Sequence, residues 1–303
     1  MLDSPLVFFI FNRPDPTRLV WEQIRQAQPR RLFLVADGPR PARAGEKERC
    51  AEVRRIVESV DWPCTVERNY SAANLGCGKR IASGLDWVFS QVETAIILED
   101  DCLPDPSFFP FCEELLNRYR DEPRVAQIAG CSYQGGYQAH PSTSYYFSRY
   151  PHCWGWATWR RAWSHYDRAM KSWPEWRDGN GLARWIENSA ERRLWVRNFN
   201  DTANGLIDTW DYQWTMTVWR QQWVSILPYR NLISNIGFGP DATHTNDFSA
   251  VAALPLSSMP FPLQHPSIIT CDQEADERTS HLVFRPPSLF ERCKRRLRKI
   301  FRQ

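Results

Sequence analysis

Three consecutive acids, Glu99-Asp100-Asp101, are the residues of this 303-residue chain best suited to chemistry. They directly follow the apolar run 96–98, which is typical of a buried strand. Carboxylates crowded at the end of such a strand repel one another and lose hydration unless a cation offsets their charge. Because Mg²⁺ and Mn²⁺ take carboxylate and phosphate oxygens, the cluster predicts a divalent-metal site for a nucleotide diphosphate. The alternative is a solvated loop whose acids cap the next helix.

Polar residues also follow two earlier apolar runs. Asn12-Arg13 come after residues 6–11, and Asp37 comes after residues 31–36. Arg13 could bind a base or phosphate, and Asp37 could accept hydrogen bonds from a base or ribose. Arg80 opens a helix after two glycines, where backbone amides and a cation suit an anion. The alternatives are a helix cap for Asn12-Arg13, a turn for Asp37 and a surface cation for Arg80.

The elements that must position these residues alternate along the first 130 residues. The apolar patterns predict strands at 6–11, 31–36, 64–68 and 94–98, with helices at 15–27, 46–60, 78–91 and 106–119. This alternation predicts an α/β fold with a mostly parallel sheet and helices on both faces. Ligands bind beyond the carboxyl ends of such strands, so the polar groups should converge on one rim.

Twelve of the fifteen tryptophans lie between Trp154 and Trp223. This region predicts helices at 158–165, 181–188 and 208–221 and strands at 223–227 and 232–235. Most of its rings should be core, but Trp154, Trp156 and Trp210 are candidates for packing against a sugar.

The order of these motifs resembles the nucleotide-sugar domain of GT-A glycosyltransferases. The most similar pattern is that of the N-acetylglucosaminyltransferase I type and of bacterial family-2-like relatives, over about residues 5–245. The motifs that carry the resemblance are Asn12-Arg13, Asp37, Arg80-Ile81-Ala82, Glu99-Asp100-Asp101 with Pro104-Asp105-Pro106-Ser107-Phe108-Phe109, Trp154-Gly155-Trp156, Trp210-Asp211-Tyr212-Gln213-Trp214 and residues 237–244.

The resemblance implies a GT-A, Rossmann-like fold and an inverting, metal-dependent transfer from a nucleotide-diphosphate sugar, with uridine as the expected base. The acceptor would be a hydroxyl of a glycan or a lipid-linked molecule. The resemblance implies that Asp101 binds Mn²⁺ or Mg²⁺ and that His244 lies near the metal and the diphosphate. It implies that Asp100 contacts the ribose, Glu99 the nucleotide or sugar, and Arg13 and Asp37 the base. It also implies that Asp211 is the general base that removes the proton of the acceptor hydroxyl. The family's W-D-D-W is altered here, so Asp208 rivals Asp211.

The chain divides into a nucleotide-sugar-binding half (1–130), an acceptor-side half of the same domain (131–245), a loop-rich segment (246–284) and a basic tail (285–303). The tail carries eight Lys/Arg and one Glu, a charge of +7, so the +3 total leaves −4 for the rest. Its helical spacing of apolar residues predicts an amphipathic helix that could lie on an anionic membrane surface. A solvated terminus, or a helix docked on the body, is the alternative.

Composition excludes several classes. A body of charge −4 does not favour nucleic-acid binding. No apolar run reaches the roughly 18 residues of a membrane span, and nine cysteines without a CxxC pair suit a reducing compartment. These features predict a cytoplasmic protein, or one peripheral on the inner leaflet. A glycoside hydrolase and a non-catalytic sugar-binding protein stay open as alternatives. A sugar nucleotidyltransferase is disfavoured, because the first strand meets Asn12-Arg13-Pro14 and not a glycine-rich phosphate loop.

Overall fold

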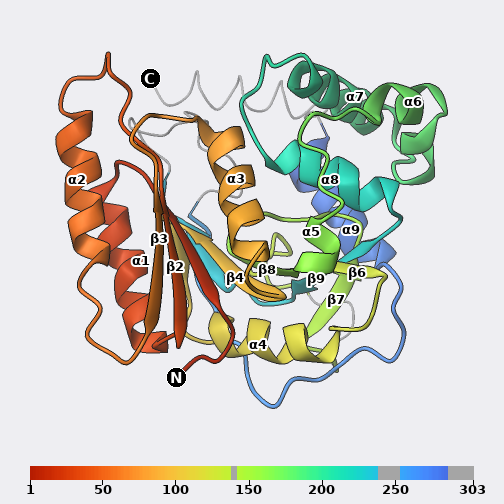
Figure 1. The fold of residues 1–303 in the computed structure, drawn as a ribbon. Coiled ribbons are helices and arrows are strands. Elements are labelled where there is room, and N and C mark those ends of the chain that lie inside the picture. Colours follow the sequence, from red (N-terminus) through yellow and green to blue (C-terminus); the bar gives the residue numbers. More distant parts are fainter. Residues whose placement is uncertain (138–141, 238–252, 286–303) are drawn as a thin grey trace, which may run out of the picture.

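The computed structural model describes residues 1–137, 142–237 and 253–285, and its centre is one eight-stranded sheet in the order β3-β2-β1-β4-β8-β6-β9-β7 (Figure 1). Within it β8 and β7 run opposite to the other strands. Its strands are β1 (Leu6–Ile10), β2 (Arg31–Ala36), β3 (Thr65–Tyr70), β4 (Thr94–Glu99), β6 (Val125–Ala129), β7 (Tyr145–Ser148), β8 (Trp156–Trp159) and β9 (Val224–Pro228). A small antiparallel sheet pairs β5 (Cys102–Pro104) with β10 (Ile233–Asn235).

Helices cover both faces of the parallel part of the sheet. In β1 the side chains of Leu6, Phe8 and Ile10 pack in one core cluster, and those of Val7 and Phe9 pack in another. The first cluster includes α1 (Pro14–Ala27), α2 (Glu46–Val57) and α4 (Phe108–Arg118); the second includes α3 (Cys77–Phe89). Burial on both faces explains why these strands are continuous apolar runs. The predicted α/β class, with a mostly parallel sheet between helices, is confirmed.

Later helices extend the face that α3 covers. They are α5 (Arg160–Trp163), α6 (Trp173–Asp178), α7 (Ser189–Ala203) and α8 (Asp211–Arg220). After them α9 (Gln273–Thr279) packs near β7 and continues into a π-helical turn, Ser280–Phe284. One sheet therefore takes strands from both halves of the chain that the sequence analysis separates.

Two elements of the tryptophan-rich region differ from the prediction. The helix expected at 158–165 is instead β8 followed by the short α5, because Ala157 pairs with Ile96 of β4 and Ile128 of β6. The helix expected at 181–188 is a single 3₁₀ turn, Gly181–Arg184. The long helix is α7, which starts after Asn188 because that side chain accepts from the amides of the next turn at 3.0 Å.

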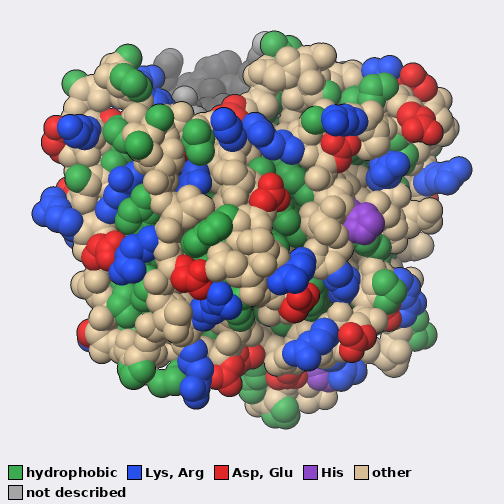
Figure 2. Space-filling view, in the orientation of Figure 1, with side chains coloured by type: hydrophobic (Ala, Val, Ile, Leu, Met, Phe, Trp, Pro, Cys, Tyr) green, Lys and Arg blue, Asp and Glu red, His purple; other side chains and the backbone are tan. Residues whose placement is uncertain are grey.

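The prediction for the basic tail falls, apart from Arg285, outside the described residues. None of the helices in the described part of the chain combines the length and apolar character that a membrane span requires. On the face shown in Figure 2, Lys and Arg side chains are interspersed with Asp and Glu. This face shows no broad field of one charge.

Candidate functional site

The polar residues that end three strands meet at one edge of the sheet. Ile10 of β1 lies opposite Ala36 of β2, and Phe9 lies opposite Glu99 of β4. The residues that follow these strands therefore emerge side by side, since neighbouring strands are only about 4.8 Å apart. The amide of Phe11 donates to Oδ2 of Asp100 at 3.1 Å, which ties β1 directly to the acidic cluster. The predicted convergence of strand ends is confirmed.

Arg13 bridges two of the three acids. Its Nη1 donates to Oδ2 of Asp101 at 2.8 Å, and its Nη2 donates to Oδ1 of Asp100. The Asp100 side chain is 3% exposed and that of Asp101 is 14% exposed. Burial opposes the charge of Arg13, but the two carboxylates outweigh it and raise its pKa. Arg13 is therefore an internal counter-ion of the acid pair, a contact that the sequence does not predict.

The acid of α8 lies within electrostatic range of this cluster. Burial, and then the charges of Asp101, Asp100 and Asp211, raise the pKa of Glu99 to about 8 against the lowering effect of Arg13. Burial also raises the pKa of the Cys77 and Cys153 thiols, with added contributions from both Glu99 and Asp211. The fold thus brings Asp211 to the same site as the strand-end acids, although the two motifs are far apart in sequence.

The structure gives Asp208 and Asp211 different surroundings. Asp208 is exposed, and its Oδ1 accepts from the amide of Gly78 at 3.0 Å, at the start of α3. That contact satisfies a free helix amide and gives Asp208 a structural role. Asp211 is half-buried at the start of α8, where Thr209 Oγ1 donates to its Oδ1. The sequence analysis does not predict a role for Thr209, because the sequence does not indicate which residue a threonine before a helix will bond to.

Asp37 has no oxygen left open for a base or ribose. Its Oδ1 accepts from the amides of Gly38 at 2.8 Å and Leu75 at 2.9 Å. Its Oδ2 accepts from the side chain of Asn74 at 3.0 Å and the amide of Gly76 at 3.2 Å. Burial raises the pKa of this carboxyl, while these amides lower it. The expected contact to the base is therefore corrected: Asp37 holds loop 71–76 against the rim.

Arg80 and Asn12 are likewise committed to the protein. Arg80 is buried, and its Nη2 donates to the carbonyl oxygen of Asn69 and to its Oδ1, the latter at 3.0 Å. Burial lowers its pKa. Asn12 Nδ2 donates to Oε1 of Glu46 at 2.8 Å, at the start of α2. Both side chains thus have protein partners, and their direct contact with a ligand stays a prediction.

Of the three candidate tryptophans, two are core residues. Trp156 and Trp210 are 1% and 3% exposed and stack on each other at 5.2 Å between ring centroids. The expectation that they contact sugar is therefore corrected. Gly155, at φ +57°, turns the chain so that Trp154 packs on the other side, edge-on to Tyr133 at 5.9 Å. Trp154 is half-buried and stays the candidate for sugar contact.

We expect Trp156→Ala to lower the free energy of unfolding by about 3–5 kcal/mol, the usual cost of removing a buried aromatic ring. Trp154→Ala should cost less, since its ring is half-buried. Urea denaturation followed by circular dichroism measures both. Equal costs for the two substitutions would contradict the division between a core ring and a surface ring.

Comparisons with known sequences and with solved structures give different results. No family model matches the sequence, and neither does any curated protein. Among solved structures, UDP-glucose pyrophosphorylase complexed with UDP-glucose is similar over 48% of this chain and 62% of its own, with 13% identity and a TM-score of 0.28. The apo form of the same enzyme is similar over 48% of this chain and 63% of its own, with 13% identity and a TM-score of 0.27. The chain thus spans less than two thirds of these structures.

The donor set at the rim fits a divalent cation in its chemistry. Mg²⁺ is commonly held by one or two carboxylates together with substrate phosphates, and Asp101 offers one partly exposed carboxylate. Within residues 1–137, 142–237 and 253–285, no three His, Cys, Asp or Glu side chains form a metal-binding group by themselves. Gly237 lies against Asp101, since an added Cβ would come 2.1 Å from its Oδ2. His244, the other predicted metal residue, lies outside the described residues.

Glu99 should make stability depend on pH. The folded protein keeps its proton up to about pH 8, whereas the unfolded chain releases it near 4.5. Between these values the folded state binds more protons, so stability falls as pH rises. We expect the free energy of unfolding of the wild type to fall by about 1 kcal/mol or more, relative to Glu99→Gln, between pH 5 and 8. Parallel pH curves for the two proteins would contradict the raised pKa.

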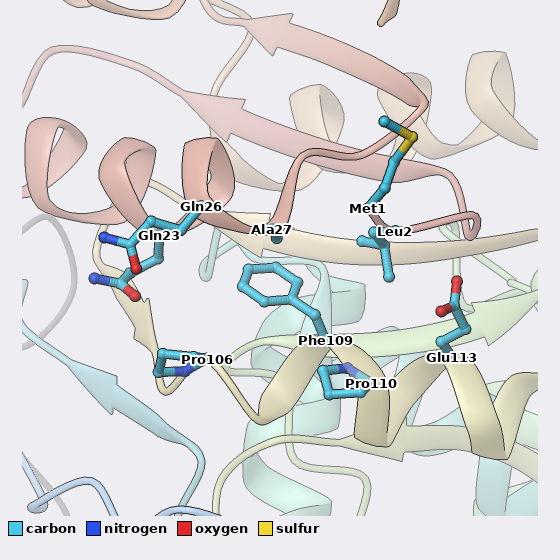
Figure 3. Close-up of a pocket in the computed structure, with 9 residues that line it drawn as sticks. All are labelled: Met1, Leu2, Gln23, Gln26, Ala27, Pro106, Phe109, Pro110 and Glu113. Atoms are coloured by element: carbon cyan, nitrogen blue, oxygen red, sulfur yellow. The ribbon is translucent and has the colours of Figure 1, made fainter. Parts of the chain in front are cut away.

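A separate cavity of about 280 Å³ lies between the N-terminus, α1 and the start of α4. Figure 3 shows its lining, in which Phe109 points inward and the side chains of Gln23 and Gln26 lie at one end. Its carboxylate, Glu113, accepts from the amides of Asp3 and Ser4 at 2.8 and 2.7 Å. None of the predicted site residues lines this cavity, so the candidate site remains the strand-end rim.

Proposed function

We propose that this protein is an inverting, metal-dependent glycosyltransferase that moves a sugar from a nucleotide diphosphate to an acceptor hydroxyl. The observation that carries the proposal is the placement of Asp211 within electrostatic range of the acidic cluster that Arg13 bridges. Such a reaction needs positive charge at the leaving diphosphate and a carboxylate base at the incoming hydroxyl. At this rim, Arg13 offers positive charge and Asp211 offers a carboxylate.

On the acceptor side, Asp211 removes the proton of the attacking hydroxyl. The hydrogen bond from Thr209 Oγ1 helps to fix the position of the Asp211 carboxylate. The half-buried Trp154 offers a ring for the apolar face of the acceptor sugar. Its neighbour Cys153 lies within electrostatic range of Asp211 and Glu99, which supports placing Trp154 beside the reacting groups. The burial of Trp156 and Trp210 keeps this wall rigid.

On the donor side, Asp101 would hold the cation, and Arg13 contributes a positive charge of its own. Mn²⁺ or Mg²⁺, when bound, supplies the charge that neutralises the leaving diphosphate. Ribose contact by Asp100 and nucleotide or sugar contact by Glu99 are roles that follow from the resemblance to GT-A enzymes; Asp100 is tied to β1 through Phe11. A uridine base follows from the resemblance to GT-A enzymes. The basic composition of residues 285–303 supports a lipid-linked acceptor at an anionic membrane surface.

A thermal-shift panel tests the proposal. The protein is heated with UDP, GDP, CDP, ADP and dTDP, each with and without Mn²⁺. A nucleotide present at a hundred times its dissociation constant should stabilise the folded state by about 2.7 kcal/mol, and only with metal. Stabilisation by none of the five would overturn the proposal. The nucleotide that stabilises most identifies the base.

A further inference from the structure

A groove outside the strand-end rim lies between α6, the turn Gly181–Arg184 and the far end of α8. Its volume is about 470 Å³, within the range of small-molecule sites. Asp211 is the first residue of α8 and Arg220, which lines the groove, is the last. At 1.5 Å per residue the groove lies roughly 14 Å along the helix from Asp211. It is therefore a different site from the proposed transfer centre.

Two half-buried indole rings, Trp176 and Trp185, line this groove. Trp176 packs on the backbone of Gly181, where an added Cβ would come 2.2 Å from the indole Nε1. The ring also contacts Trp173, at 6.0 Å between centroids. The carbonyl of Trp185 accepts from Arg149, which fixes its backbone. These contacts hold the Trp176 ring and the Trp185 backbone in place before any ligand arrives, which lowers the entropic cost of binding.

Charged side chains of both signs surround the two rings. Glu175, Arg184 and Arg220 line the groove and are exposed. Within the described part of the chain, their side chains form no hydrogen bond or ion pair, so their donors and acceptors are available to a ligand. Beside them Gln221 bonds His165 at 3.2 Å. A sugar ring has an apolar face and hydroxyl groups around its edge. A surface with aromatic rings and neighbouring hydrogen-bond donors and acceptors is therefore suited to bind it.

We propose that this groove binds a carbohydrate unit. An apolar peptide segment would leave the charged side chains without partners. A nucleotide would stack on the indoles, but its phosphate would meet the carboxylate of Glu175 as well as the two arginines. A neutral sugar satisfies both signs of charge through its hydroxyls. The inference stands independently of the proposed transferase activity.

Saturation-transfer NMR and calorimetry of the full chain test this site. The probes are short oligosaccharides of N-acetylglucosamine, glucose, galactose and mannose, with UMP as a competing probe. We expect at least one oligosaccharide to bind and Trp185→Ala to weaken it about tenfold. Arg220→Ala, at an exposed residue, should weaken it as well without a risk to folding. Trp87→Ala, at a half-buried tryptophan of α3 that packs on Phe33, is the matched control and should leave affinity unchanged.

Because the groove lies apart from the strand-end rim, we expect that saturating UDP with Mn²⁺ does not displace the sugar. Absence of binding by all four oligosaccharides, or equal affinity in both groove variants and the wild type, would overturn the inference. So would displacement by UDP, or UMP binding that the same two substitutions weaken in place of sugar binding. The thermal shift by nucleotide diphosphates should persist in both groove variants. A failure of this inference is thus distinguishable from a failure of the proposed function.

Discussion

Replacing Asp211 with Asn should abolish sugar transfer while nucleotide binding survives. The substitution removes the carboxylate that takes the acceptor proton, and general-base catalysis contributes about a hundred- to ten-thousand-fold to rate. The amide keeps the shape of the side chain, including an oxygen that can accept from Thr209. We therefore expect kcat to fall by that factor with little change in the thermal shift that nucleotide and Mn²⁺ produce.

Asp208→Asn is the matched control, because Asp208 is the rival acid and lies three residues before Asp211. Its carboxylate accepts from Gly78 at the start of α3, a bond that the Asn oxygen can also accept. We expect nearly full activity from this variant. Loss of transfer in Asp208→Asn with retention in Asp211→Asn would move the base to Asp208.

Asp101→Asn should remove the metal dependence of nucleotide binding. The substitution deletes the charge of the partly exposed carboxylate assigned to the cation, and it weakens the ion pair with Arg13. In calorimetric titrations we expect the affinity for UDP with Mn²⁺ to fall at least about a hundredfold, equivalent to about 2.8 kcal/mol. Removing metal with EDTA should lower the wild-type affinity to a similar level.

Arg13→Met distinguishes the contribution of the Arg13 guanidinium to nucleotide binding from that of the metal ion. It removes the guanidinium that bridges Asp100 and Asp101 but leaves both carboxylates. A variant that still binds Mn²⁺ with UDP, more weakly than the wild type, would fit a supporting role for Arg13. Unchanged affinity in Asp101→Asn would contradict the assignment of the metal ligand.

The strand-end rim could be predicted from sequence because it depends on regular backbone structure. Runs such as Leu6 to Ile10 are apolar throughout, so both the strand and its end are visible. The parallel topology then places Asp37 and Glu99 at one edge without further information.

The partners of these side chains could not be predicted, because they depend on loop geometry. Asp37 is saturated by amides of residues 75 and 76, which the sequence does not place around it. Arg13 pairs with Asp100 and Asp101 because of the path of the chain after β1, and nothing in its spacing indicates this.

The tryptophans show the same limit. A single left-handed residue, Gly155, sends Trp154 and Trp156 to opposite sides of the sheet. The segment 156–159 alternates too briefly to separate a strand from a helix, and pairing with β4 and β6 decides it. The long α7 was missed because its apolar spacing is sparse and its start depends on the Asn188 cap.

The most direct test of the transferase proposal follows the phosphorus of a nucleotide sugar by ³¹P NMR. The protein is incubated with UDP-sugars and Mn²⁺, and in a second sample pyrophosphate is added. We predict metal-dependent formation of UDP, with water or an added glycan as acceptor, which Asp211→Asn abolishes. Formation of UTP and a sugar 1-phosphate from pyrophosphate, without UDP in either sample, would contradict the account and identify a nucleotidyltransferase instead.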